Sequence, residues 1–190
     1  MVNSVKPTRE NIVAAAFQQF NETGDLSMRK VGDAVGVTAT ALYHHFKNKQ
    51  ELLDAVADRG FGIFDKRVRS VNTTDPAGII RGVLEGYRAF AMDYANLFGL
   101  MFVEPRPVAR KFPVDFAAHR SAVFNLLWKA VADCMEDGAG SDPDESLHLA
   151  HDIWALTHGH ILLWRAGRFS NEPAFREVLG RSIDTFIDAL

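Results

Sequence analysis

The stretch that decides the fold runs from residue 27 to residue 49 and reads SMRKVGDAVGVTATALYHHFKNK. Ser27 and Thr38 can each cap a short helix, and Gly36 lies in the tight turn between them. Two short helices joined by such a turn form a helix-turn-helix. In that motif the second helix enters the major groove of DNA and presents its N-terminal residues to base edges.

The second helix has one face suited to a protein core and another suited to DNA. Leu42 and Phe46 are four residues apart, so both should face the interior. The side chains that then point outward are small or form hydrogen bonds, and they include no carboxylate: Thr38, Ala39, Thr40, Tyr43 and His44. Lys47 and Lys49 flank the start of the next helix, where a lysine and backbone N–H groups form a site suited to a phosphate. Considered as geometry alone, an ordinary helix pair in an all-α protein explains the pattern equally well.

Apolar residues recur at helical spacing through the rest of the chain, which predicts an all-α protein of about nine helices. The first should begin after Thr8 and end at Gly24. The others are expected over these ranges: a long helix from Lys49, then Pro76 to about Ala95, a short one to Val103, Val114–Glu136, a helix from Pro143 to about Ala166, and one from Pro173 to the C-terminus. Asn48 with Glu51, and Asp142 with Glu145, fit the spacing of a capping box, and Asp137–Ser141 should be a loop.

The composition limits the class of protein. Among 190 residues 47% are hydrophobic and 24% are charged, values that exclude a disordered chain or a rod. The single cysteine, Cys134, excludes an intrachain disulfide and a zinc site of paired thiolates. No apolar run reaches the ~18 residues that cross a bilayer, and the N-terminus opens no signal peptide, so we expect a cytoplasmic protein without a membrane partner.

The net charge of −3 argues against a nucleic-acid partner only when it is averaged over the chain. Residues 1–50 carry six Lys and Arg against four Asp and Glu, whereas residues 51–190 carry fifteen against twenty. The small basic surplus therefore coincides with the helix-turn-helix. A local patch, not the overall charge, decides whether a protein binds a polyanion.

The run GVTATALYHHFKNKQELL at residues 36–53 closely resembles the signature of the tetracycline-repressor (TetR) family, as do the stretches Ile12–Phe20 and Met28–Gly32 with Gly24 between them. The resemblance implies a homodimer with a DNA-binding domain over residues 1–50 and a ligand-binding and dimerisation domain over residues 51–190. It implies a ligand-responsive transcriptional regulator without enzymatic activity, a repressor that a small apolar or aromatic effector releases from its operator. An activator, or a regulator without a ligand, stays open.

Position by position, the resemblance implies DNA contacts from Arg29, Lys30, Thr38, Ala39, Thr40, Tyr43, His44 and Lys49. Lys49 would hold a phosphate, and Arg29 and Lys30 would touch the DNA backbone. Ala39 departs from the family pattern in its type of side chain, because a methyl group can contact only a thymine methyl or a sugar. We therefore expect few base contacts, a larger contribution from DNA shape, and an operator of two-fold related half-sites.

Aromatic side chains and methionine are frequent in the middle helices, and together they suit a pocket for an apolar or aromatic effector. Ordinary core packing explains each of them singly. The candidate ligand-binding residues are Phe61, Phe64, Tyr87, Phe90, Tyr94, Phe98, Met101, Phe102, His119, Phe124, Trp128, Trp154 and His158. Their tyrosines and histidines are the candidate polar anchors, and Arg88 and Arg120 would pair with an acidic effector.

The last two expected helices carry more apolar positions than one face needs, which indicates burial in the protomer and against a partner. A two-fold four-helix interface would contain Ala155, Gly159, Leu162, Ala166, Phe175, Leu179, Ile183 and Phe186. A larger monomeric core stays open as the alternative. The element from Asp152 to Gly159 is also similar to a Trp–His–Gly element in one branch of TetR-like C-terminal domains.

Four histidines near the C-terminus raise a rival function, a helical metal-binding protein or enzyme: His148, His151, His158 and His160. No HExxH motif or paired ExxH run accompanies them, so nothing in the sequence fixes a coordination geometry. Surface histidines or hydrogen-bonded core histidines account for them. We therefore expect no metal site, no cofactor and no catalytic residue.

Overall fold

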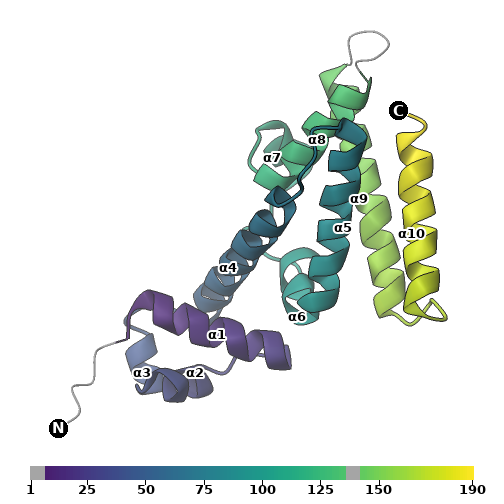
Figure 1. Ribbon diagram of the computed structural model, residues 1–190. Coiled ribbons are helices and arrows are strands. Elements are labelled where there is room, and N and C mark those ends of the chain that lie inside the picture. The colour runs from purple at the N-terminus through teal and green to yellow at the C-terminus, as the bar shows by residue number, and fades with distance from the viewer. Residues whose placement is uncertain (1–6, 136–141) are drawn as a thin grey trace. The chain divides into compact units, whose positions relative to one another are not determined.

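The computed structural model describes residues 7–135 and 142–190. These residues form ten α-helices and one π-helix and include no strand, so the all-α prediction is confirmed (Figure 1). They pack as two compact units, which we call the reader unit and the body unit. The reader unit contains the described residues up to Phe64 together with Phe90–Pro105, and the body unit contains Asp65–Ala89 and Arg106–Leu190. Among the described helices, none combines the length and the apolar character that crossing a membrane requires.

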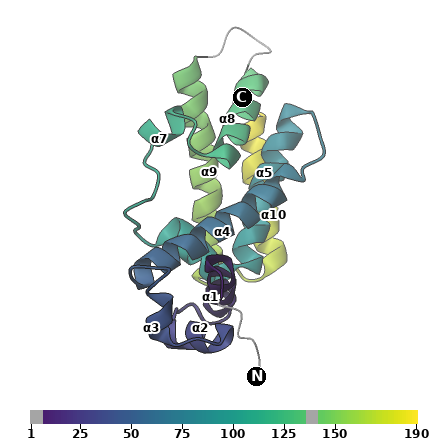
Figure 2. The same cartoon turned by 90° about the vertical axis from the view of Figure 1, so that its left-hand side faces the viewer.

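The reader unit is built on three N-terminal helices, α1 (Arg9–Thr23), α2 (Met28–Val35) and α3 (Ala39–Leu42). Helix α2 packs on both α1 and α3, as the second view shows (Figure 2). The Thr8 hydroxyl accepts the N–H of Asn11 at 3.2 Å, while the Asn11 side chain accepts the N–H of Thr8 at 3.1 Å. This reciprocal cap starts α1, and Gly24 ends it at φ 71°.

Three further elements complete the reader unit: the first part of α4 (Lys49–Arg69), α6 (Ala95–Phe98) and the π-helix η1 (Gly99–Val103). The predicted short helix to Val103 is thus a single turn of α-helix, α6, that continues as the π-helix η1. Helix α6 packs against α1, and the Asn96 side chain donates to the carbonyl of Asn21 at 2.9 Å. That contact lies directly beside the C-terminal end of α1.

The body unit contains most of α5 (Pro76–Asp93) and the helices α7 (Val114–Ala117), α8 (Ala122–Met135), α9 (Pro143–Arg165) and α10 (Glu172–Ile187). Helix α9 packs on α8 and on α10, and α10 runs beside it in the opposite direction (Figure 1). The Asp142 carboxylate caps α9 with Pro143 at the first helical position, as predicted. It accepts the N–H of Asp144 at 2.9 Å rather than that of Glu145.

The prediction of one continuous helix over Val114–Glu136 is wrong, because the helix is interrupted between α7 and α8. His119 has a left-handed backbone with φ 54°. The Asp115 carboxylate accepts the backbone N–H of Lys111 and a guanidinium N–H of Arg120, and the Asn125 amide donates to the His119 carbonyl at 2.9 Å. Side-chain hydrogen bonds rather than glycine or proline stabilise the break. Glu136 and the predicted loop at 137–141 lie outside the described residues.

Candidate nucleic-acid interface

The turn of the helix-turn-helix depends on two glycines. Gly36 ends α2 with φ 75°, a conformation that other residues rarely adopt. Gly32 lies one turn earlier, and a Cβ atom placed there would lie 2.7 Å from the carbonyl oxygen of Val37. Helix α2 therefore packs directly on the backbone of the turn. This close approach fixes where α3 begins.

The segment from α3 to Phe46 has an inner face and an outer face, as predicted. Leu42 and Phe46 are 0% and 1% exposed, whereas Tyr43 is 51% exposed. The helical path continues past Leu42, because the N–H of His45 donates to the Leu42 carbonyl at 2.9 Å. The outer side chains consequently follow one another along successive turns at the surface of the reader unit.

The residues expected to contact DNA lie at the surface of this unit. Seven are exposed: Arg29, Lys30, Thr38, Thr40, Tyr43, His44 and Lys49. Ala39 is half-buried, since it follows the turn that packs on Gly32. The Thr38 hydroxyl also caps α3 by accepting the N–H of Ala41 at 3.3 Å. Contact of these residues with DNA stays a prediction.

Two residues of this surface that sequence reasoning missed are Asp25 and Arg9. Lys49 Nζ lies 3.0 Å from Asp25 Oδ1, and the hydrogen bond from Lys49 lowers the pKa of the Asp25 carboxyl. The Arg9 guanidinium lies over the Phe46 ring at 4.5 Å and is 3.7 Å from Glu51. Both pairs join residues far apart in sequence, so no local sequence pattern predicts them.

The start of α4 carries a modified form of the predicted capping box. The Asn48 side chain accepts the N–H of Glu51 at 2.8 Å, and the Glu51 carboxylate accepts the N–H of Lys47 at 2.7 Å. The return bond thus reaches one residue earlier than in the usual box.

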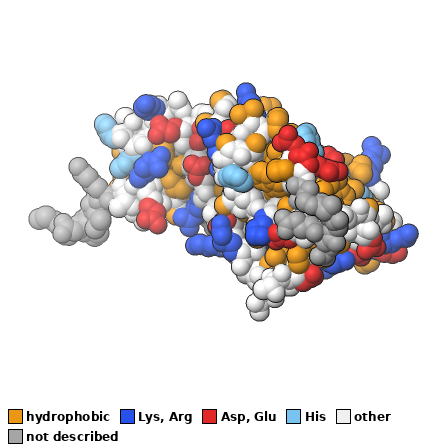
Figure 3. Space-filling model, turned by 90° about the horizontal axis from the view of Figure 1, so that it is seen from above, with side chains coloured by type: hydrophobic (Ala, Val, Ile, Leu, Met, Phe, Trp, Pro, Cys, Tyr) orange, Lys and Arg blue, Asp and Glu red, His pale blue; other side chains and the backbone are white. Residues whose placement is uncertain are grey.

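On the face of the molecule in Figure 3, Lys and Arg side chains are interspersed with Asp and Glu.

The candidate ligand-binding residues fall into two aromatic clusters, one in each unit. The reader-unit cluster consists of Phe61, Phe64, Phe90, Tyr94, Phe98, Met101 and Phe102. Its rings pack closely: Phe64 lies 5.4 Å from Phe90, and Phe61 lies 5.5 Å from Phe102. These contacts have the geometry of a packed core.

The body-unit cluster contains Tyr87, His119, Phe124, Trp128, Trp154 and His158. The Tyr87 hydroxyl and His158 Nδ1 are 2.8 Å apart, and Trp154 packs against both rings. Burial raises the pKa of Tyr87 and lowers the pKa of His158. Two predicted polar anchors therefore bond to each other. The exposed His119 instead stacks on Trp128 at 4.9 Å.

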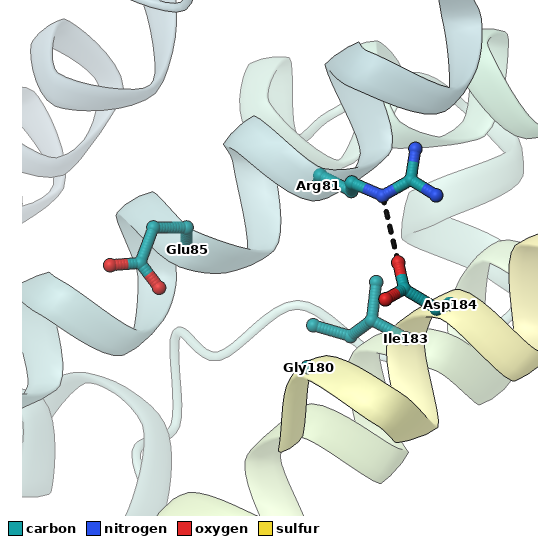
Figure 4. A pocket seen from close by; sticks show the side chains of 5 residues that line it. All are labelled: Arg81, Glu85, Gly180, Ile183 and Asp184. Atoms are coloured by element: carbon teal, nitrogen blue, oxygen red, sulfur yellow. Dashed lines mark hydrogen bonds and ion pairs between the residues drawn. The ribbon is translucent and has the colours of Figure 1, made fainter. Parts of the chain in front are cut away.

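Arg88 and Arg120, the arginines proposed as partners for an acidic effector, already donate hydrogen bonds to carboxylates of this chain. The buried Arg88 donates two hydrogen bonds to Glu85, at 2.7 and 2.6 Å. Arg120 donates to Asp115 at 2.7 Å. A shallow hollow of about 270 Å³ lies between α5 and α10, lined by Arg81, Glu85, Gly180, Ile183 and Asp184 (Figure 4). None of the candidate ligand-binding residues lines this hollow.

The histidines of α9 have structural partners. His148 and His151 contact the Phe112 ring, at 5.2 and 4.1 Å between ring centroids. The ring of His160 bonds to the Leu156 carbonyl at 2.9 Å. Within residues 7–135 and 142–190, no three His, Cys, Asp or Glu side chains gather closely enough to hold a metal ion.

The expected dimer-interface residues divide into buried and accessible positions. Phe175, Leu179 and Ile183 are 0%, 2% and 6% exposed and belong to the core of the body unit. Phe186 is half-buried, as is Gly159, and space is open around the Gly159 Cα. The exposed positions are Ala155, Leu162 and Ala166, and the neighbouring Leu163 and Val178 are exposed as well.

Two family models match the chain. The model described as bacterial regulatory proteins of the tetR family matches residues 12–56, and the model of the tetracyclin repressor-like C-terminal domain matches residues 80–190. The first match contains the whole helix-turn-helix. The second begins in α5 and includes α7 to α10.

Curated relatives match over part of the chain. The class D tetracycline repressor protein of Escherichia coli is 45% identical over 51 residues, which are 26% of this chain and 23% of the relative. The transcriptional activator FasR of Mycolicibacterium smegmatis is 30% identical over 127 residues, 63% of this chain and 58% of the relative. The chain thus spans about a quarter of the length of the first of these and less than two thirds of the second.

Solved structures share the fold over almost the full chain. A protein of unknown function from Rhodococcus sp. RHA1 has a TM-score of 0.78 at 24% identity, with 100% of this chain and 98% of that chain covered. A TetR variant from Acinetobacter baumannii AYE in complex with minocycline has 0.68 at 20%, covering 97% and 96%. The protein BioQ, solved with its double-stranded DNA operator, has 0.62 at 23%, covering 96% and 99%.

Proposed function

Because the chain belongs to the tetracycline-repressor family of bacterial regulatory proteins, we propose that it is a sequence-specific DNA-binding regulator of transcription. One observation carries the proposal. Thr40 on α3, and Tyr43 and His44 directly after it, are exposed, while Gly32 and Gly36 hold α3 in helix-turn-helix geometry. An exposed tyrosine beside short hydrogen-bonding side chains suits base edges and phosphates.

We propose that the protein binds DNA as a homodimer through residues 1–50, with residues 51–190 for the ligand and the partner. Two copies would place their α3 helices in successive major grooves, ~34–36 Å apart. The accessible apolar surface along and just after α9 and on α10 supports an interface at Ala155, Gly159, Leu162, Ala166 and Phe186, extended by Leu163 and Val178. Phe175, Leu179 and Ile183 would support this interface from within the protomer core.

We propose that a small apolar or aromatic effector controls DNA binding and that the protein is a repressor without enzymatic activity. The body-unit cluster around Tyr87 and His158 supports such a site, because it joins aromatic walls to a polar pair. The minocycline complex and the operator complex of the structural neighbours support a ligand and DNA as partners. The similarity to FasR favours an activator as the second candidate. Either regulator would act on bacterial DNA in the cytoplasm.

The experiment that tests this proposal is selection of duplexes from a random-sequence library by the purified protein. We expect enrichment of a sequence with two related half-sites, and affinity that falls steeply with salt. Tyr43→Ala and Lys49→Ala should weaken binding, and Lys49→Ala should reduce the salt slope by about 0.9. Failure to enrich any sequence, together with stoichiometric bound metal in the purified protein, would support the metal-protein alternative instead.

A further inference from the structure

Asp25 lies in the short loop between α1 and α2, where its neighbours fix its position. The Thr23 hydroxyl accepts the Asp25 N–H at 3.3 Å, and its proton lies within reach of the carbonyls of Gln19, at 2.9 Å, and Asp25, at 3.0 Å. The next residue, Leu26, is 1% exposed and anchors the loop in the core of the reader unit. The carboxylate is consequently presented at the surface from a constrained backbone.

This carboxylate forms an ion pair with Lys49, the lysine that the proposed function assigns to a DNA phosphate. Lys49 Nζ lies 3.0 Å from Asp25 Oδ1, and both side chains are accessible to solvent, 48% exposed for Lys49 and 77% for Asp25. A phosphate that approaches Lys49 from solvent therefore meets a fixed negative charge at hydrogen-bonding distance from the same ammonium group. Carboxylate and phosphate repel each other and compete for one cation.

We propose that Asp25 limits DNA affinity by competing with a DNA phosphate for Lys49. This inference rests on the proposed function. Binding exchanges the Lys49–Asp25 pair for a Lys49–phosphate pair, so the free protein must break the first pair before it gains the second. Removal of the Asp25 charge should tighten DNA binding by about two- to fivefold, the range that an exposed ion pair contributes. Asp25 is then a residue whose loss improves binding.

The test is a double-mutant cycle with the 30-bp duplex that the wild-type protein enriches from a random-sequence library. Dissociation constants are measured by fluorescence anisotropy at fixed salt for wild type, Asp25→Asn, Lys49→Ala and the double variant. Glu22→Gln is the matched control, because Glu22 lies on α1, bonds to the neutral Gln18 and carries the same charge. Asp25→Ser serves as a second neutral variant, and melting temperatures verify that each protein is folded.

Competition predicts that Asp25→Asn tightens binding more than Glu22→Gln does, and more in the wild-type background than beside Lys49→Ala. The second difference isolates the cost of breaking the ion pair, since general repulsion between Asp25 and DNA acts in both backgrounds. Equal gains in the two backgrounds, or equal effects of Asp25→Asn and Glu22→Gln, would overturn the inference alone. A wild-type protein that enriches no duplex contradicts the proposed function as well.

Discussion

The helix-turn-helix and the body unit use polar side chains in opposite ways. At the end of α3, the buried Leu42 and the exposed Tyr43 are adjacent, and the polar side chains point to solvent. In the body unit, some polar side chains point inward and bond to each other, as Tyr87 does with His158. The first arrangement leaves hydrogen-bonding groups for a partner that arrives from outside. A ligand that entered the second arrangement would have to replace bonds that the protein already makes, which would cost part of its binding free energy.

The strongest test of this contrast is to change the two adjacent residues at the end of α3. Leu42→Ala should lower the free energy of unfolding by about 2–5 kcal/mol, because it leaves a cavity in the core of the reader unit. Tyr43→Ala should leave stability within about 0.5 kcal/mol and weaken DNA binding instead. Urea denaturation and duplex binding, measured on both variants, separate the two effects. A large loss of stability in Tyr43→Ala would contradict the division between inner and outer faces.

In the body unit, the inward polar groups can be tested at Arg88. Arg88→Met keeps the apolar stem but removes two hydrogen bonds to Glu85, and it should cost about 1.5–3 kcal/mol. Arg176→Met, which removes an exposed guanidinium 3.8 Å from the same carboxylate, should cost less than about 1 kcal/mol. Urea denaturation measures both. Equal losses would show that burial does not strengthen the Arg88 pair.

The Arg88 pair also has a pH dependence. Its hydrogen bonds lower the pKa of the Glu85 carboxyl, so the stabilisation is complete above the unfolded-state pKa of about 4.3 and is lost as pH falls through the lower folded-state value. The stability difference between wild type and Arg88→Met should therefore shrink in acid. A difference that stays constant through this range would mean that packing of the introduced methionine side chain, rather than loss of the ion pair, sets it.

Alanine substitutions at two glycines of the reader unit should change stability by a smaller amount, and the second serves as a control for the first. Gly32→Ala should destabilise the protein by about 1–3 kcal/mol, because the added methyl group meets the Val37 carbonyl. Gly62→Ala, at a position in α4 with open space around it, should stabilise by about 0.5–1 kcal/mol. Thermal denaturation gives both signs. Matching changes at the two positions would contradict the close approach of α2 to the turn.

The smallest expected effect concerns His158. Burial lowers its pKa in the folded state, so the folded protein binds fewer protons than the unfolded chain once pH falls below about 6.5. Stability should therefore fall on acidification from that pH until the folded-state pKa is passed. Melting temperatures between pH 8 and pH 5.5 should fall less steeply in His158→Gln than in wild type. Parallel slopes would exclude His158 as the cause.

Helix boundaries were predictable where the cause is local. Thr8, Ser27, Thr38 and Asp142 cap the next helix through their own side chains, and a residue type at one position carries that information. The break at 118–121 was not predictable, because it depends on Asp115 and Asn125 folding back on the chain. The inner face of α3 could be predicted from the spacing of Leu42 and Phe46.

Long-range pairing accounts for what the sequence did not reveal about the candidate sites. Lys49 and Asp25 are 24 positions apart, and Tyr87 and His158 are 71 apart. An apolar stripe likewise cannot distinguish burial in the protomer from burial against a partner, so Phe175 and Leu162 looked equivalent. The structure separates them by exposure, 0% against 36%.

The missing side chain at Gly32 has a mechanical consequence. With the backbone of the turn in contact with α2, the two helices cannot slide or change their angle without opening a gap in a close-packed region. We therefore expect the pair to move as one stiff part. Under the proposed regulation, we expect a signal to shift or rotate this part as a whole without reshaping it, so that its position and orientation are what an effector would adjust.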